Sequence, residues 1–310
     1  MKHLFSVLAG VVFLSGLSAA DDPMAEIMAV TQKNSVTVKE KQIDTKGTDK
    51  IPVKRRSVFT FKTSAGERQI IYNRWLNNQP DFKGKHPSLN WEAGVGFGGG
   101  LFGNWYGNNT IRVFINESDV MAKSPAEVKF ADGEQGVLTL TWDLGSKRTL
   151  VLDFRVMPEN NRVYCQIRMD LKDMNVKSIR VNLRGYPGGF APAYKMPSER
   201  YGVADKDITC AMVKNKSVHY TLAPEGQWAF SGDKIAKNGA IAAIFDPVGA
   251  QGKATMKISY YEGGFSLTYP GTVRKIDLGL YAFTQQNDVA LAAFRARVAK
   301  DMQEIKTLYK

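Results

Sequence analysis

A period of two in hydrophobicity runs through most of this chain and constrains its fold more than any other feature. Apolar and polar residues alternate over residues 57–62, 136–142, 148–157 and 162–171, and a turn-forming segment, residues 158–161, joins the last two runs as a hairpin. Successive side chains of a strand point to opposite faces, so each run predicts a strand with one buried face. About a dozen or more such runs, with no helical pattern between them, predict an all-β fold: a large antiparallel β-sandwich.

The C-terminal region follows a different period. From Leu291 to Tyr309, apolar residues recur at spacings of three and four, and Asp288 is placed to cap the first turn. This pattern predicts one amphipathic helix over residues 288–309, with its apolar stripe packed on the sheet. No internal repeat or low-complexity linker divides the chain, so we predict one β-sandwich domain (57–310) that ends in this helix. A signal peptide (1–20) and a polar basic N-terminal segment (21–56) are predicted to precede it.

Residues 1–20 have the layout of a secretory signal peptide. A short basic start with Lys2 precedes an apolar run over residues 4–17, and small residues up to Ala20 follow it. The apolar run is shorter than the roughly 20 residues of an ordinary membrane span. We therefore expect cleavage after Ala20 and an exported, periplasmic or extracellular protein without a transmembrane segment. The alternative is an uncleaved N-terminal anchor.

The chain is basic, with a formal net charge of +12 at pH 7. In an exported protein this charge favours an anionic neighbour, such as an acidic polysaccharide, a charged envelope surface or anionic lipid headgroups. A generally basic surface that keeps the protein soluble explains the charge equally well. The sequence contains no nucleic-acid-binding motif, so nucleic acid is not an expected partner.

Two cysteines, Cys165 and Cys210, lie in strand-like stretches. In an exported protein a disulfide between them can persist. The alternative is two buried free thiols, which behave as small apolar residues. So few cysteines and histidines make a Cys/His zinc site unexpected, and we predict neither a metal nor a cofactor.

Residues 90–109, NWEAGVGFGGGLFGNWYGNN, combine glycines with aromatic and amide side chains. They contain a formal G-x-G-x-x-G match, but the residues that follow do not form a helical pattern, so a dinucleotide site is not predicted. Aromatic faces and planar amides suit sugars, and pockets of this kind hold few but well-placed polar groups. The candidate ligand-binding residues are Arg74, Trp91, Asn104, Trp105, Tyr106 and Asn108. The alternative places the tryptophans in the core, with the glycines letting strands bend around them.

Candidates for catalysis are few. His86 and His219 are the histidines after the predicted leader, and Glu92 and Glu262 are the carboxylates in the least regular segments. A histidine can act as a general base near neutral pH, and a pair of carboxylates can hydrolyse glycosides at a set separation. For each histidine the alternative, a hydrogen-bonded structural residue, is the favoured one. A long irregular segment, residues 184–207, has the length typical of functional loops.

Residues 147–190, KRTLVLDFRVMPENNRVYCQIRMDLKDMNVKSIRVNLRGYPGGF, resemble the central strands of galactose-mutarotase-like β-supersandwich domains. The resemblance implies a supersandwich fold and a sugar-related ligand. Mutarotases use two histidines and a carboxylate in family motifs. The segments around His219 and Glu262 do not reproduce those motifs, so epimerase activity is not carried over.

These observations lead to three functional hypotheses. The first is an exported carbohydrate-binding β-sandwich protein whose ligand is an anionic polysaccharide. The second is a polysaccharide-active enzyme of the lyase or epimerase type, in which His86 or Tyr106 acts as a base and Arg74 stabilises a uronate carboxylate. The third is a non-catalytic structural or interaction protein of the cell envelope.

Overall fold

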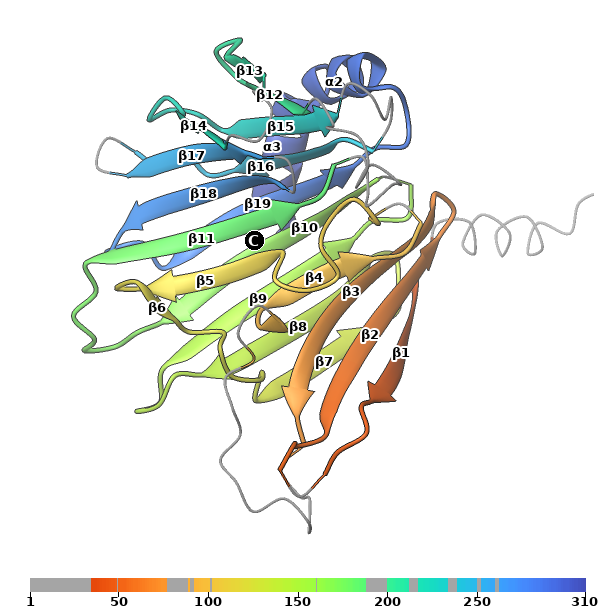
Figure 1. Cartoon of the computed structure of the whole chain (residues 1–310), viewed down its shortest axis with the longest axis vertical. Coiled ribbons are helices and arrows are strands. Elements are labelled where there is room, and N and C mark those ends of the chain that lie inside the picture. The colour runs from red at the N-terminus through yellow and green to blue at the C-terminus, as the bar shows by residue number, and fades with distance from the viewer. Residues whose placement is uncertain are drawn as a thin grey trace, which may run out of the picture. The chain divides into compact units, whose positions relative to one another are not determined.

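A computed structural model gives the architecture of the chain. It describes residues 35–48, 50–76, 89, 92–100, 102–159, 161–187, 200–211, 217–233, 239–249, 252–259 and 262–310, with the side chains of residues 210 and 211 left out. These residues belong to one compact unit, Asn34–Lys310. The unit is an all-β sandwich of two antiparallel sheets, which confirms the predicted fold class (Figure 1).

The first sheet has ten strands. Their order in space is β1 (Thr37–Asp44), β2 (Lys54–Thr63), β3 (Gly66–Trp75), β4 (Val95–Gly98), β5 (Ile111–Ile115), β11 (Ser178–Gly185), β18 (Gly263–Pro270), β17 (Lys253–Ile258) and β14 (Val218–Thr221), with β6 (Ser118–Asp119) paired to β5. β5, β11 and β18 are neighbours although long stretches of chain separate them, so the middle of this sheet is made by non-local pairing.

The second sheet has nine strands. Their order is β13 (Thr209–Ala211), β12 (Arg200–Ala204), β15 (Trp228–Asp233), β16 (Ile241–Phe245), β19 (Lys275–Ala282), β10 (Arg162–Asp170), β9 (Thr149–Val156), β8 (Gly136–Asp143) and β7 (Glu127–Ala131). The hairpin predicted over residues 148–171 is β9–β10, with Val163 opposite Val156. β12 lies within the segment 184–207 that was predicted to be irregular, and β4 lies within the glycine-rich segment.

The main core lies between the sheets and is built by the alternation seen in the sequence. On β8, Leu138, Leu140 and Trp142 are buried and the residues between them are less so. On β5, Ile111, Val113 and Ile115 face the same core. Burying one such side chain contributes about 1.5–3 kcal/mol, so the period of two fixes which face of each strand points inward.

The ten-stranded sheet begins before residue 57, where the β-sandwich was predicted to start. β1 lies inside the segment 21–56 and pairs along its whole length with β2, from Thr37 opposite Lys62 to Asp44 opposite Arg55. The sandwich therefore includes residues that the sequence assigned to a separate polar segment. Their polarity has a simple cause: β1 is an edge strand and most of its side chains are exposed, and charged side chains on an edge discourage unwanted pairing.

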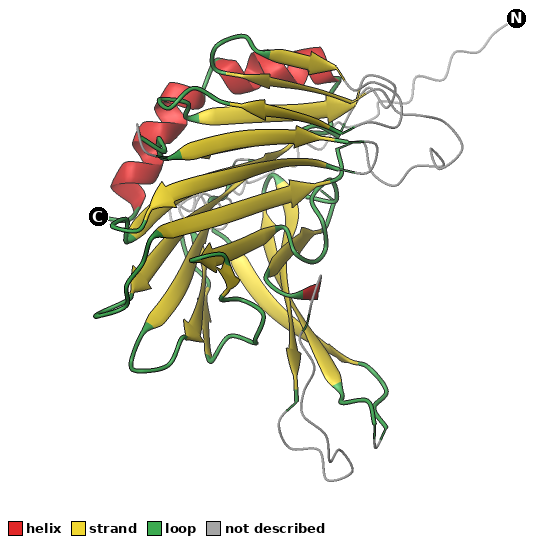
Figure 2. Ribbon diagram, turned by 60° about the vertical axis from the view of Figure 1, so that its left-hand side comes forward, coloured by secondary structure: helices red, strands yellow, loops and turns green. Residues whose placement is uncertain are grey.

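Two helices cover the outer face of the nine-stranded sheet, where the sequence predicted one (Figure 2). They are α2 (Asn287–Arg295) and α3 (Val298–Leu308). The predicted apolar stripe does pack on the sheet: Phe294, Met302 and Ile305 are buried against a cluster that contains Tyr281. The helix is interrupted at Arg297, whose backbone leaves the helical conformation, with φ −121° and ψ −10°. The guanidinium of Arg297 donates a hydrogen bond to Asp301 in the first turn of α3.

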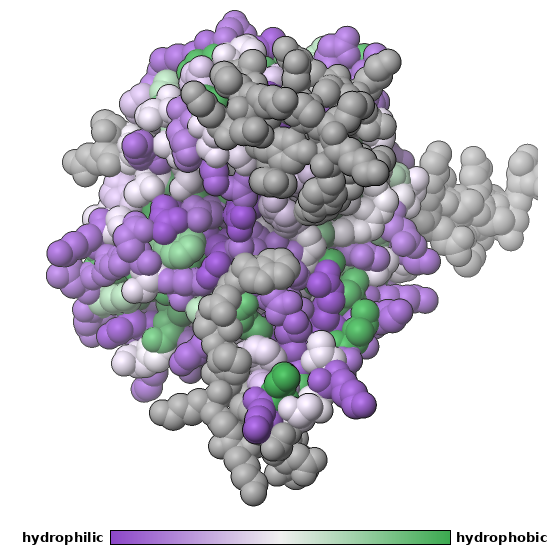
Figure 3. Space-filling model, in the orientation of Figure 1, coloured by the Kyte–Doolittle hydropathy of each residue, from purple (hydrophilic) through white to green (hydrophobic). Residues whose placement is uncertain are grey.

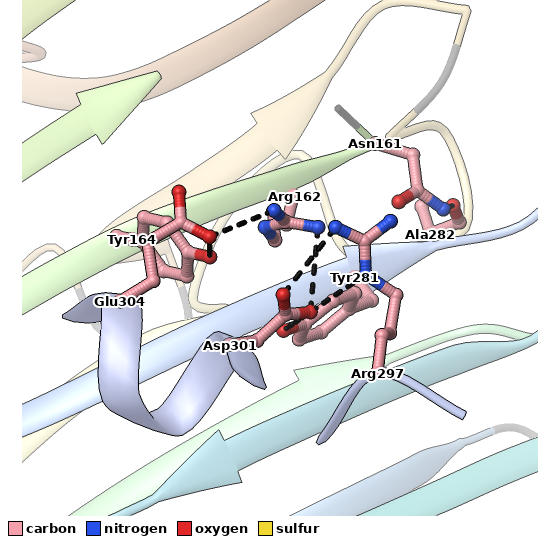
Figure 4. Close-up of polar contacts among 8 residues, drawn as sticks. All are labelled: Asn161, Arg162, Tyr164, Tyr281, Ala282, Arg297, Asp301 and Glu304. Atoms are coloured by element: carbon pink, nitrogen blue, oxygen red, sulfur yellow. Dashed lines mark hydrogen bonds and ion pairs between the residues drawn. The ribbon is translucent and has the colours of Figure 1, made fainter. Parts of the chain in front are cut away.

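A buried polar network joins α3 to the sheet (Figure 4). Asp301 accepts hydrogen bonds from the hydroxyl of Tyr281 at 2.7 Å and from Nε of Arg297 at 2.8 Å, and it pairs with Arg162 at 3.3 Å. One turn later Glu304 accepts from Arg162 at 3.0 Å. Because Asp301 is fully buried, these partners are what makes its charge tolerable at the interface.

The candidate disulfide between Cys165 and Cys210 is not formed. Cys165 is a buried free thiol on β10. Cys210 lies on β13, and four strands of the same sheet stand between the two. At about 4.8 Å per strand the backbones lie more than about 20 Å apart, whereas a disulfide spans at most about 7 Å between Cα atoms.

Candidate functional site

A cleft of about 440 Å³ lies on the outer face of the ten-stranded sheet. It lies over β5, β11, β18, β17 and β14, and hydrophilic side chains gather on this face (Figure 3). The lining comprises Asn109, Arg112, Phe114, Arg180, Asn182, Leu183, Arg184, His219, Thr255, Lys257, Glu262, Gly264, Phe265 and Ser266. Cationic, amide and hydroxyl groups therefore meet beside an aromatic ring.

Strand alternation puts these side chains on one face. On β11, Ile179, Val181 and Leu183 are buried, so the residues between them point outward. The register then aligns outward residues in rows across the sheet: Asn182 lies opposite Arg112 on β5 and opposite Ser266 on β18. The polar half of each alternating strand is thus the floor of the cleft.

One end of the cleft is organised by Glu262. Its carboxylate accepts from Nε and Nη2 of Arg184, at 3.0 and 2.5 Å, and from Nζ of Lys257 at 2.6 Å. Burial raises the pKa of Glu262, but the hydrogen bonds from Lys257 and Arg184 outweigh burial, and the pKa is lowered below its usual value. The group is therefore a carboxylate held firmly in its charged form.

The other end carries two arginines. Arg180 lies over the ring of Phe114, with its guanidinium carbon 3.9 Å from the ring centroid, and pairs with Glu117 at 2.7 Å. Arg112 pairs with Asp119. The pKa of Arg112 is lowered, first by burial and then by repulsion from the neighbouring arginines, which shows how closely the cations are gathered.

The cleft also contains two amides, Asn182 in its middle row and Asn109 in its wall. Oδ1 of Asn182 accepts from Nη1 of Arg180 and from the hydroxyl of Ser266, both at 3.0 Å. Asn109 is 3% exposed, and its Oδ1 has no hydrogen-bond partner in the described part of the chain. Its backbone has a φ of 56°, in the left-handed region that few residues other than glycine and asparagine adopt. A buried acceptor without a donor is costly, and here it lies in the wall of a cleft.

The glycine-rich segment forms the neighbouring wall. Residues 104–110 lie across β4, with Phe97 N donating to Tyr106 O at 2.9 Å. A Cβ on Gly96 would lie 2.3 Å from the carbonyl of Gly107, so this close crossing requires glycine. Arg56 and Asn73 hold the loop by donating to Oδ1 of Asn108, at 3.0 and 3.1 Å.

The structure separates the predicted ligand-binding residues. Trp105 was wrongly predicted to stack on a ligand: it is 2% exposed and its Nε1 donates to Tyr281 O at 2.9 Å, between the sheets. Asn104 is also structural, since its Nδ2 donates to Phe283 O. Arg74 lies on the same face of β3 as the core residue Tyr72, away from the cleft.

Two of the remaining candidates lie near the cleft. Tyr106 is half-buried, with the guanidinium carbon of Arg184 5.4 Å from its ring centroid. Burial, followed by the negative charge of Glu262, raises the pKa of Tyr106 to about 12. Asn108 positions the loop through its partners rather than lining the cleft. Trp91 lies outside the described residues.

Among the catalytic candidates, His219 and Glu262 line the same cleft. Glu92 does not: it is paired with Lys54 at 2.6 Å. His86 lies outside the described residues. Sequence reasoning missed the cleft's arginines, Arg112, Arg180 and Arg184, whereas Asn109 belongs to the glycine-rich segment that was singled out. The only signal for the arginines was their place at the polar positions of alternating strands, which is also where ordinary solvent-facing residues lie.

Within the described residues, no cluster of three or more His, Cys, Asp or Glu is arranged to hold a metal ion. The same part of the chain contains no helix with the length and apolar character needed to span a membrane.

No family model and no curated protein matches this chain. Solved structures resemble it. A protein assigned as an aldose 1-epimerase from Klebsiella pneumoniae subsp. pneumoniae is 10% identical, over 86% of this chain and 95% of that one, with a TM-score of 0.48. The alpha-N-acetylgalactosaminidase NagBb from Bifidobacterium bifidum is 7% identical, over 84% and 39%, with a TM-score of 0.46. The galactosidase domain of an alpha-galactosidase-sucrose kinase is 9% identical, over 74% and 41%, with a TM-score of 0.41.

This chain spans about two fifths of the length of the last two proteins. All three TM-scores are below 0.5, so the similarities carry no argument about ligand, activity or site residues.

Proposed function

We propose that this protein binds carbohydrate in the cleft of the ten-stranded sheet, and that the ligand is an anionic saccharide such as a segment of an acidic polysaccharide. The observation that carries the proposal is the composition of the cleft: four cationic side chains against one carboxylate, with two amides, hydroxyls and two phenylalanines, line one cavity. Arginine and lysine suit carboxylates, whereas amides and hydroxyls suit sugar hydroxyls. A surface that merely attracted anions would not need the neutral donors and acceptors.

We further propose that the protein acts after export, in the periplasm or outside the cell. The layout of residues 1–20 supports export, and the net charge of +12 suits an acidic polysaccharide as neighbour.

A polysaccharide-active enzyme is the second candidate, because His219 and Glu262 line the same cleft. The environment of the other groups favours binding. Glu262 is held by two cations and its pKa is lowered, which makes it a weak proton acceptor. Tyr106, with its pKa raised to about 12, stays protonated at neutral pH and is poorly suited to act as a base.

The test is a calorimetric titration of the mature protein with oligogalacturonates and with neutral galacto-oligosaccharides, while ultraviolet absorbance follows any unsaturated products. We expect binding of the acidic ligands without products. Lys257→Met removes one of the cleft's cations and one of the two cations that hold Glu262 in place, and should weaken binding about tenfold. Lys129→Met is the matched control, because it removes an equal charge from β7, outside the cleft.

Product formation would favour the enzyme. Equal losses of affinity in both lysine variants would show that the acidic ligands are bound by general electrostatic attraction and not by the cleft. Failure of the wild-type protein to bind any acidic or neutral saccharide would contradict the proposal and favour the third candidate, a structural or interaction protein of the envelope.

A further inference from the structure

The carboxylates at the two ends of the cleft differ in burial and in the number of hydrogen bonds that hold them. Glu262 is 10% exposed and receives three hydrogen bonds from two cations. Glu117 is 65% exposed, lies in a turn and contacts Arg180 with a single oxygen, Oε2. Removing a buried carboxylate from its partners costs several kcal/mol, whereas an exposed ion pair contributes at most about 1 kcal/mol. An incoming anion can therefore replace Glu117 but not Glu262.

Arg180 is preorganised for such an exchange. Its guanidinium stacks on Phe114, and Nη1 is fixed by Asn182 at 3.0 Å. The remaining edge, Nε and Nη2, donates to Oε2 of Glu117 at 3.1 and 2.7 Å. That edge matches the two oxygens of a carboxylate, so a ligand carboxylate can make two parallel bonds where Glu117 uses one oxygen.

The Glu262 end presents acceptors instead. Arg184 N donates to Thr110 O at 2.9 Å, which places the neighbouring Asn109 at this end. Asn109 brings an unpartnered carbonyl oxygen and Glu262 a charged carboxylate. Both suit a hydroxyl donor, and the two cations of this end, Arg184 and Lys257, are already bound to Glu262 rather than open to a second carboxylate.

The two ends are far enough apart to contact different sugar rings. Arg180 and Arg184 lie on the same face of β11, four residues apart, which corresponds to about 13 Å at about 3.3 Å per residue. A single ring does not span that distance, whereas two linked rings do.

We propose that the cleft binds its saccharide in one direction, with the carboxylate of an acidic ring on Arg180 beside Phe114 and the hydroxyls of an adjoining neutral ring between Asn109 and Glu262. This inference rests on the proposed function and narrows its ligand to a saccharide that contains both kinds of ring. In the absence of ligand, Glu117 then occupies the edge of Arg180 that the ligand carboxylate would bind.

The probe is an aldobiouronic acid, which has one uronate and one neutral ring, compared with the same disaccharide after reduction of its carboxylate to an alcohol. Both are titrated calorimetrically at constant ionic strength into the wild-type protein, Arg180→Gln and Arg184→Gln. The arginine variants are matched, because each removes one guanidinium from the same face of the same strand. Circular dichroism confirms that each variant is folded.

We expect Arg180→Gln to lower the preference for the acidic over the reduced disaccharide by about tenfold or more, the size of a charge-assisted contact. Arg184→Gln should weaken both disaccharides and change the preference much less. Glu117→Gln, by freeing Arg180, should strengthen only the acidic disaccharide, by about two- to fivefold. Asn109→Gly keeps the left-handed backbone and removes the acceptor, so it should weaken both.

A preference abolished by Arg184→Gln and kept by Arg180→Gln would overturn the orientation, and so would a Glu117→Gln variant with weaker acidic binding. Wild-type protein that binds neither disaccharide, nor any other saccharide, would instead contradict the proposed function itself. The two failures are therefore distinguishable.

Discussion

At the scale of single residues, the cleft is governed by how each charge is compensated. Glu262 shows this most clearly, because two cations compensate for its burial and keep it ionised. The pKa of its folded form is lowered below the usual 4.5. The carboxylate therefore binds its proton more weakly in the folded state, and ionisation above about pH 4.5 favours folding. That contribution is lost as the pH falls through the lowered pKa.

A Glu262→Gln variant should be less stable than wild type at pH 7, by about 1.5–3 kcal/mol, because Arg184 and Lys257 lose their charged acceptor. The difference should shrink as the pH falls from about 4.5, where the carboxylate of the unfolded chain takes up a proton, through the lowered pKa of the folded protein. Urea denaturation across a pH series measures it. Glu117→Gln is the control, since its exposed side chain should change stability little at any pH. A difference that is independent of pH would show that packing, rather than charge, accounts for the loss.

At the scale of elements, the site depends on one strand and the loop that crosses it. β4 and the loop 104–110 approach so closely that Gly96 and Gly107 meet backbone to backbone. The loop then continues into Asn109 and β5, so its path sets one wall of the cleft. The glycines of this segment permit the crossing, and the aromatic residue Trp105 anchors the loop in the core.

Gly96→Ala should therefore displace the loop and destabilise the protein by about 1–3 kcal/mol, the usual cost of overpacking. Saccharide binding should weaken as well, because Asn109 would move. Gly100→Ala lies in the same segment, where a Cβ would meet nothing within 4 Å, and should change stability by less than about 0.5 kcal/mol. Thermal unfolding and calorimetric binding report the two effects. Equal behaviour of the two variants would argue against a close crossing.

At the scale of the whole molecule, the sequence predicts the elements better than their assembly. The period of two identified the strands and the inward face of each, because burial enforces it. It did not indicate that β5, β11 and β18 become neighbours, which is what brings Arg112, Asn182 and Ser266 into one row. The sequence left two positions open for Trp105, on a ligand surface or in the core, because an aromatic residue beside glycines has the same local pattern in both. The opposing sheet decides for the core.

The helices form a third layer, which should unfold in the same cooperative step as the two sheets. Asp301 on α3 is fully buried and bonded to Tyr281 of the sheet, so Asp301→Ala leaves Arg162 partly uncompensated and should cost about 3–5 kcal/mol. Cys165 can report whether this loss reaches the core, because it faces the opposite side of β10 from the helices and burial raises the pKa of its thiol. In a Cys210→Ser background, thiol labelling then requires opening of the sandwich.

If the three layers open together, Asp301→Ala should speed the labelling of Cys165 by about a hundredfold or more, since about 1.4 kcal/mol corresponds to a factor of ten. Asp170→Ala, an exposed position at the end of the same strand, should leave the rate nearly unchanged. Labelling that stays slow in Asp301→Ala, while circular dichroism shows loss of helix, would mean that the helices detach alone. The cleft on the far sheet would then be independent of them, and saccharide affinity measured in the same variant would remain at the wild-type value.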